Sequence, residues 1–177
     1  MARRDDEEYV EFVRAVARSL RRTAYLLCGD WQRAEDAVQD ALVRVYVAWP
    51  RLDRSGGLHS YAHRALVSSA LDEAKRPWRR RETPTAAVAE SSVPGDTLAE
   101  LDDRWVVLTA LAHLPPRQRA CVVLRYYEDR PVDDVARVLG CTSGTVKSQT
   151  ARGLDALRRR LAETGTVELT AGEGYRS

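Results

Sequence analysis

The chain has 177 residues and a mass of 19.9 kDa, enough for one ordinary domain or two small ones. Its 28 basic and 26 acidic residues leave a formal net charge of +2, so any basic surface that binds nucleic acid must be local. Cys28, Cys121 and Cys141 stand far apart, which argues against a disulfide framework or a zinc site. No apolar run reaches the roughly 20 residues that span a bilayer, so we expect a cytoplasmic protein without membrane insertion.

The first eighty residues predict three helices. Apolar residues recur at helical spacing from Tyr9 to Leu27, and Gly29 with Asp30 supplies a stop followed by a cap. A second helix begins near Trp31 and ends at Pro50. Its apolar face is core, and its opposite face is polar and free to bind: Glu35, Asp36, Gln39, Asp40 and Arg44. A loop over residues 51–59 precedes a third helix over residues 60–76.

A change of composition between Glu82 and Glu100 predicts a linker, because Thr, Ser, Pro and Gly cluster there without a basic or aromatic residue. Four helices follow. Three of them cover residues 102–113, 116–127 and 132–139, and the last is capped by Thr142 or Ser143. Gly140 closes the third of them in the left-handed conformation. We therefore expect an all-α chain of two small helical domains joined by a flexible linker. The boundaries are 1–81, 82–100 for the linker, 101–163, and 164–177 for a tail.

Residues 131–154 have helix-turn-helix spacing. A short first helix that crosses a second one steeply needs small Ala136 at the crossing, Gly140 at the turn and a buried Val146. The outward face then offers side chains to a DNA major groove, namely Ser143, Lys147, Ser148, Ala151 and Arg152. The alternative interpretation is an ordinary helical hairpin with a solvated polar face.

The basic segment 75–81 and the histidines are further candidate sites. Five of the seven residues 75–81 are basic and Trp78 lies among them, which suits phosphate contacts and base stacking, or merely a solvated face. His59 and His63 are four residues apart without a third ligand nearby, so we expect surface or loop histidines and no metal or cofactor. Cys121 falls in an apolar helical stripe and predicts a core residue rather than a nucleophile.

In combination these features resemble the extracytoplasmic-function (ECF) sigma factors, the small promoter-specificity subunits of bacterial RNA polymerase. Residues 24–30 with 34–46 resemble their region 2.1 to 2.2, and residues 61–76 resemble region 2.3 to 2.4. Residues 114–119 and the helix-turn-helix resemble regions 4.1 and 4.2. The resemblance covers nearly the whole chain. Only Lys75 and Lys147 among the basic residues are lysine, a bias typical of high-GC bacteria.

The resemblance implies an initiation factor without catalysis of its own, which places two DNA readers about two helical turns apart and stabilises the melted strand. Its polar second-helix face (Glu35, Asp36, Gln39, Asp40, Arg44) would bind the coiled coil of the polymerase β′ subunit. Contacts with the −10 element and single strand would come from Leu52, Asp53, Ser55, Gly56, Gly57, His59, Arg64, Ser68, Lys75, Arg76, Trp78, Arg79 and Arg80. Contacts with the −35 element would come from Thr142, Ser143, Thr145, Lys147, Ser148, Ala151 and Arg152.

Further partners implied by the resemblance are the polymerase β flap, which the C-terminal domain would contact, and an anti-sigma factor. The chain departs from its relatives at Ser68 and Ser69, where they commonly have Asn and Leu, and at Pro77, which interrupts the basic helix. Two other hypotheses remain. One is a helix-turn-helix regulator that works without polymerase, which leaves the polar face and the basic segment without a role. The other is an enzyme that uses Cys121 or His113.

Overall fold

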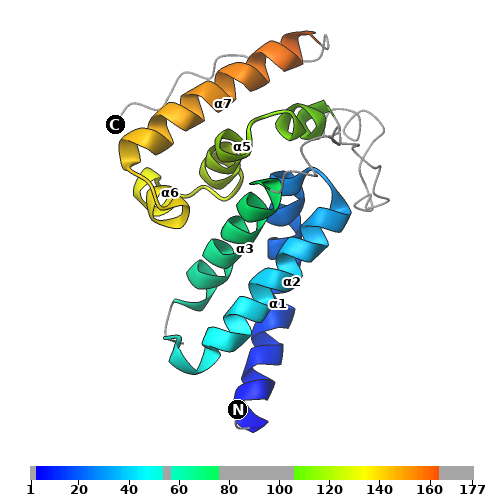
Figure 1. Ribbon diagram of the computed structural model, residues 1–177, viewed down its shortest axis with the longest axis vertical. Coiled ribbons are helices and arrows are strands. Elements are labelled where there is room, and N and C mark those ends of the chain that lie inside the picture. The colour runs from blue at the N-terminus through cyan, green and yellow to red at the C-terminus, as the bar shows by residue number, and fades with distance from the viewer. Residues whose placement is uncertain (1–2, 54–56, 76–105, 164–177) are drawn as a thin grey trace.

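The computed structural model describes residues 3–53, 57–75 and 106–163, and every regular element in these ranges is a helix (Figure 1). The all-helical prediction is confirmed for this part of the chain. In the same part, no helix combines the length and the low polarity that crossing a membrane requires. The linker and tail boundaries fall outside the described residues.

The N-terminal helices form a three-helix unit. They are α1 (Arg3–Cys28), α2 (Trp31–Ala48) and α3 (Leu58–Lys75), with the short 3-10 helix η1 (Trp49–Arg51) after α2. Their apolar stripes meet in a core in which Leu20, Val45, Trp49 and Leu66 are at most 1% exposed. Burying side chains of this size supplies most of the folding free energy of such a small unit.

The boundaries of these helices follow from local chemistry. Gly29 ends α1 with a positive φ of 71°, and its N–H donates to the carbonyl of Tyr25. Asp30 then caps α2, because its carboxylate accepts a hydrogen bond from the backbone N–H of Arg33 at 2.9 Å. Both predictions are confirmed. The third helix begins at Leu58, two residues earlier than expected.

The C-terminal helices are a segment over residues 106–112, α5 (Pro116–Val122), η3 (Val123–Tyr127), α6 (Val132–Leu139) and α7 (Ser143–Glu163). The sequence predicted one helix from Pro116 to Tyr127. Its second half is instead a π-helix, in which the N–H of Glu128 reaches back five residues to the carbonyl of Val123. This wider turn changes the direction in which the chain leaves the helix.

The helix-turn-helix prediction is confirmed by α6 and α7. Gly140 has φ 60° and ψ 44°, the left-handed conformation that the turn requires. Val135, Ala136 and Val146 are buried where the two helices cross. Gly153 lets α7 approach α5 closely, because a Cβ at this position would lie 2.8 Å from a methyl group of Val122.

The two halves of the chain touch each other, which the sequence did not predict. Helix α3 contacts α5 and α6, and α1 contacts α5 and η3 (Figure 1). A Cβ placed on Gly29 would lie 3.0 Å from that of Ala112, so the end of α1 packs closely on the C-terminal half. Beside it the guanidinium of Arg119 donates to the carbonyl of Leu27 at 2.9 Å.

Candidate nucleic-acid and protein interfaces

The polar face of α2 points outward, as the sequence predicted for the polymerase-binding set. Asp36, Gln39, Asp40 and Arg44 are exposed. Glu35 is half-buried and forms an ion pair with Arg21 of α1 at 2.5 Å. Four of the five predicted residues therefore form a continuous surface, and the fifth helps to fix α2 on α1.

This face is tied to α3 by hydrogen bonds. The carboxylate of Asp40 accepts from the hydroxyl of Ser69 at 2.5 Å and pairs with Arg44 at 2.9 Å. Arg44 also donates to the hydroxyl of Ser68 at 3.3 Å. The two serines thus join α2 to α3. Asp40 has a structural role as well as an exposed position.

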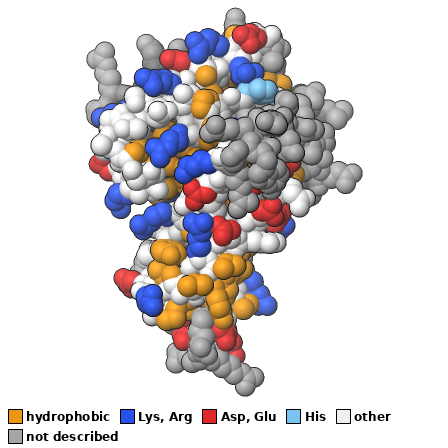
Figure 2. Space-filling model, in the orientation of Figure 1, with side chains coloured by type: hydrophobic (Ala, Val, Ile, Leu, Met, Phe, Trp, Pro, Cys, Tyr) orange, Lys and Arg blue, Asp and Glu red, His pale blue; other side chains and the backbone are white. Residues whose placement is uncertain are grey.

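The same side of α2 carries hydrophobic residues that sequence reasoning missed. Val43 is 60% exposed and Val47 is 71% exposed, each one helical turn beyond a polar residue of the face. Val10 and Tyr46 are also exposed, and Figure 2 shows hydrophobic side chains gathered at the end of the molecule where α1 begins. The signal was present in the sequence, since Val43 and Val47 lie outside the apolar stripe that forms the core.

The residues predicted for the −10 element are only partly described. Asp53, Gly57, His59, Arg64 and Lys75 are exposed, whereas Leu52 and Ser68 are half-buried. His59 packs edge-on against the ring of Phe12, and Lys75 pairs with Asp72 at 2.9 Å. Six further residues lie outside the described residues: Ser55, Gly56, Arg76, Trp78, Arg79 and Arg80.

The first turns of α7 present the predicted −35 residues in two groups. Lys147, Ser148, Ala151 and Arg152 are exposed, and the opposite side of the helix is buried through Val146, Gly153 and Leu157. The others form the start of the helix. Thr142 accepts from the N–H of Thr145 at 3.1 Å, and Ser143 donates to Asp133 of α6 at 2.6 Å. Thr142, Ser143 and Thr145 therefore have structural partners. Ser148 also donates to the carbonyl of Thr145 at 3.0 Å, but it is exposed together with Lys147, Ala151 and Arg152, so these four side chains can face a groove.

The cysteines and histidines do not form a catalytic group or a metal site in the described residues. Burial raises the pKa of the Cys28 thiol to about 12 and that of Cys121 to about 11, so both remain protonated thiols at neutral pH. Cys121 is 1% exposed, which confirms the prediction of a core residue. Within the ranges that the structure covers, His, Cys, Asp and Glu side chains form no cluster able to hold a metal.

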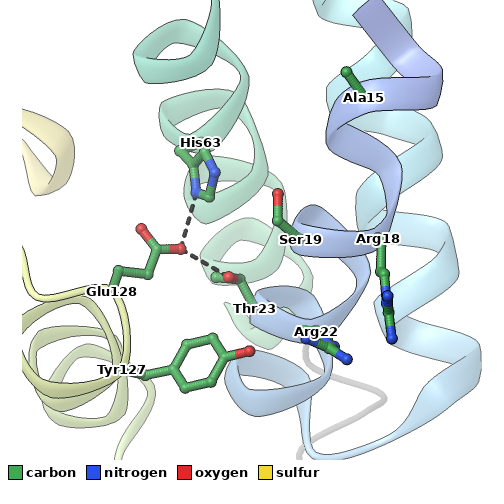
Figure 3. Close-up of a pocket in the computed structure, with 8 residues that line it drawn as sticks. All are labelled: Ala15, Arg18, Ser19, Arg22, Thr23, His63, Tyr127 and Glu128. Atoms are coloured by element: carbon green, nitrogen blue, oxygen red, sulfur yellow. Dashed lines mark hydrogen bonds and ion pairs between the residues drawn. The ribbon is translucent and has the colours of Figure 1, made fainter.

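The prediction of a surface or loop position is wrong for His63. This residue is 8% exposed and lies on α3, where it faces Glu128 of the C-terminal half, with Nδ1 2.9 Å from Oε1 (Figure 3). The hydroxyl of Thr23 on α1 also donates to Oε1, at 2.7 Å. No periodicity or motif in the sequence pointed to this contact, because its three residues come from three separate elements.

Comparison with known proteins agrees with this arrangement. The family model "Sigma-70 region 2" matches residues 12–80, and "Sigma-70, region 4" matches residues 104–157. The chain is 34% identical to the RNA polymerase sigma-E factor of Streptomyces avermitilis over 164 residues, which cover 91% of this chain and 89% of that one. It is 33% identical to the ECF RNA polymerase sigma factor SigM of Mycobacterium tuberculosis over 149 residues, 84% and 74% of the two chains.

Two solved structures share the fold. The sigma factor RpoE of Bartonella quintana, in complex with the anti-sigma factor NepR, has a TM-score of 0.70 at 23% identity and covers 88% of this chain and 98% of its own. CnrH, in complex with the cytosolic domain of CnrY, has a TM-score of 0.63 at 17% identity and covers 89% and 90%.

The chain belongs to the ECF sigma factors of RNA polymerase, since its relatives match it at more than 30% identity over most of both lengths. It is therefore an alternative sigma factor, a specificity subunit that acts with core RNA polymerase at promoters. A helix-turn-helix regulator that works without polymerase is not favoured, because the N-terminal half also matches the family.

Proposed function

We propose that residues 1–81 of this sigma factor bind core polymerase and the −10 element, and that residues 101–163 bind the −35 element. Residues 82–100 would be the linker between these domains and residues 164–177 a tail. The observation that supports this assignment is that the two predicted contact faces, on α2 and on α7, both point outward while the opposite sides of these helices are buried.

The polymerase contact is assigned to the outward face of α2. Its carboxylates and amide attract basic and polar groups of a partner helix, and the exposed valines beside them add apolar area. Interfaces commonly combine an apolar centre with a polar rim. The partner would be the β′ coiled coil, and the C-terminal half would contact the β flap. The protein acts in the cytoplasm and catalyses no reaction itself.

The promoter contacts are assigned to α7 and to α3 with the loop before it. Lys147 and Arg152 lie in the first three turns of α7, and the N-terminal part of a recognition helix is the part that reaches base edges. Arg64 on α3 and the basic segment after it would hold the melted strand through phosphate contacts. Captured bases would offset part of the few kcal/mol needed to unstack each base step.

Core binding is tested best with Asp36→Lys, since Asp40 also accepts a hydrogen bond from the buried Ser69. Asp36 is exposed, so its replacement should change the free energy of unfolding by less than about 0.5 kcal/mol. We expect the variant to bind core polymerase at least about tenfold more weakly, as reversing a charge opposite its partner costs several kcal/mol.

Glu11→Lys is the matched control, because Glu11 is exposed on α1 and the change of charge is the same. Both variants are compared with the unmodified chain in an equilibrium binding assay with purified core polymerase. If Asp36→Lys and Glu11→Lys bind equally well, the outward face of α2 is not the polymerase interface.

A further inference from the structure

A pocket lies between α1, α3 and the end of η3 (Figure 3). Its volume is about 320 Å³, at the lower end of the range that sites for small ligands have. Helix α1 supplies Arg18 and Arg22, α3 supplies His63, and the end of η3 supplies Tyr127 and Glu128. None of these residues belongs to the polymerase and promoter faces assigned above, so the proposed function leaves this pocket without a role.

The one carboxylate of the pocket has its partners within the protein. Glu128 is 8% exposed, its Oε1 accepts from the hydroxyl of Thr23 at 2.7 Å and its Oε2 accepts from Nε of Arg130 at 2.6 Å. Burial alone would raise its pKa, but the hydrogen bonds and charge supplied by His63, Thr23 and Arg130 outweigh burial and lower the pKa to about 2. Glu128 is therefore charged and already paired, and it requires no cation from a ligand.

The polar groups of the pocket that remain available are donors. Arg18 and Arg22 are exposed, and among the residues that the structure describes neither forms an ion pair. The hydroxyl of Tyr127 likewise has no hydrogen-bond partner there, and Figure 3 shows it pointing toward α1. The hydroxyl of Ser19 already donates to the carbonyl of Val16 at 3.0 Å. A ligand must therefore bring acceptors and negative charge.

The two arginines favour a phosphate over a carboxylate as the bound group. Residues four apart on a helix lie one turn from each other, with Cβ atoms about 5–6 Å apart, so Arg18 and Arg22 can hold the same ligand. A guanidinium donates two parallel hydrogen bonds to a phosphate. A carboxylate carries one charge, whereas a phosphate group on a hydroxyl carries about −1.5 to −2 at neutral pH. Two neighbouring cations thus match a phosphate or a diphosphate.

The π-helix η3 supplies the wall that faces the arginines. The N–H of Glu128 donates to the carbonyl of Val123 and that of Arg130 to the carbonyl of Leu124, so the chain turns directly after Tyr127. Turns of this type are frequent at functional sites. Tyr127 is 51% exposed, and an exposed aromatic ring is a surface on which a nucleotide base can stack.

We propose that this pocket binds a small molecule through its phosphate groups, which Arg18 and Arg22 hold while Tyr127 borders the rest of the ligand. The shared chemistry is a diphosphate, which is present both in inorganic pyrophosphate and in a nucleoside diphosphate. In the second case the base would lie against the ring of Tyr127. No contact with polymerase or promoter enters the proposal, so it stands apart from the proposed function.

The first experiment measures the binding of three probes to the full chain by isothermal titration calorimetry. The probes are inorganic pyrophosphate, adenosine diphosphate and adenosine, at constant ionic strength so that the screening of charges is the same throughout. We expect one pyrophosphate or one adenosine diphosphate per chain, and no binding of adenosine. Tighter binding of adenosine diphosphate than of pyrophosphate would place the base against Tyr127. Equal binding would assign recognition to the phosphates alone.

The second experiment compares variants of the pocket with one control. Arg18→Gln and Arg22→Gln should each weaken pyrophosphate binding about tenfold or more, because each removes charge-assisted hydrogen bonds. Tyr127→Phe keeps the ring and should weaken it about threefold. Arg14→Gln is the matched control, because Arg14 is exposed one turn before Arg18 and does not line the pocket. It should change the affinity by less than about twofold.

The replaced side chains are all exposed, so the variants should keep the helix content of the unmodified chain, which far-UV circular dichroism checks. Equal losses of pyrophosphate affinity in Arg14→Gln, Arg18→Gln and Arg22→Gln would mean that α1 attracts anions along its whole length, and would overturn the pocket. The proposal would also be overturned by the absence of saturable pyrophosphate binding, or by adenosine binding as tightly as adenosine diphosphate.

Discussion

Arg119 illustrates how one buried side chain connects distant parts of this sigma factor. Its guanidinium is 7% exposed and donates to the carbonyls of Leu27, Ala112 and Leu114. Burial lowers its pKa to about 10, which still leaves it charged at neutral pH. The first of these carbonyls lies near the end of α1, where a helix leaves acceptors without partners. Arg119 of α5 thus satisfies a carbonyl at the end of α1, in the other half of the molecule.

Arg119→Met should reduce the free energy of unfolding by about 2–4 kcal/mol, because three buried carbonyls lose their donor while the apolar volume is kept. Arg117→Met, at an exposed position two residues earlier, should change it by less than about 0.5 kcal/mol. Urea denaturation at constant slope measures both. Coincident unfolding midpoints for the two variants would mean that the carbonyls find other donors.

Among the helices, the ends that depend on local interactions could be predicted from the sequence. Asp30, Gly29 and Gly140 act through their own backbone and neighbours, so the ends of α1, α2 and α6 were predicted correctly. The π-helix η3 was not predicted, because an α-helix and a π-helix share the same apolar spacing over so few residues. The cap of α7 was also predicted, since Thr142 accepts from the N–H of Thr145. The contact of Ser143 with Asp133 of α6 was not, because a sequence pattern does not show contacts between elements.

The exposed face of α7 is expected to read the −35 element, and Arg152 is the residue that tests it. Arg152→Ala should reduce transcription from cognate promoters about tenfold or more, because a bidentate contact to guanine discriminates by about 1–3 kcal/mol. Arg158→Ala is the control, since Arg158 is exposed on the same helix, further from its start, and pairs with Asp155. The assay is in vitro transcription from a library randomised at −35. The same base preference in Arg152→Ala and the unmodified chain would rule out this face as the reader.

For the molecule as a whole, the sequence predicted two halves but not their contact. The apolar stripes of each half are visible in the periodicity, but the structure joins their buried residues into one core cluster across both halves, which periodicity does not show. Thr23, His63 and Glu128 belong to no stripe and are 40 and 65 positions apart, so only the tertiary arrangement brings them together. For the same reason the prediction of a surface or loop position for His63 was wrong.

Acid should weaken the contact of Glu128 with Thr23 and His63. Glu128 has a pKa of about 2 in the folded chain against 4.5 for a free side chain, so its contribution is complete above about pH 4.5 and is lost as the pH falls towards 2. The difference in urea midpoint between the unmodified chain and Glu128→Gln should therefore be smaller at pH 3 than at pH 7.

The remaining ionisable groups that face Glu128 are His63, Arg130, Arg18, Arg22 and Tyr127, and they are present in both chains, so their effects largely cancel in this comparison. A difference in midpoint that is equal at both pH values would show that the charge of Glu128 does not stabilise the folded chain.

The order of synthesis gives the contact between Thr23 and Glu128 a further consequence. The two residues are separated by 105 positions, and Glu128 is made 53 positions after the end of α3. At about 5–20 residues per second, the ribosome needs roughly 3–10 s to add that stretch. During this interval the N-terminal helices can fold and emerge while their carboxylate partner does not yet exist. Until then the hydroxyl of Thr23 lacks the acceptor that it has in the finished chain, so this part of α1 reaches its final packing only after the C-terminal half has been made.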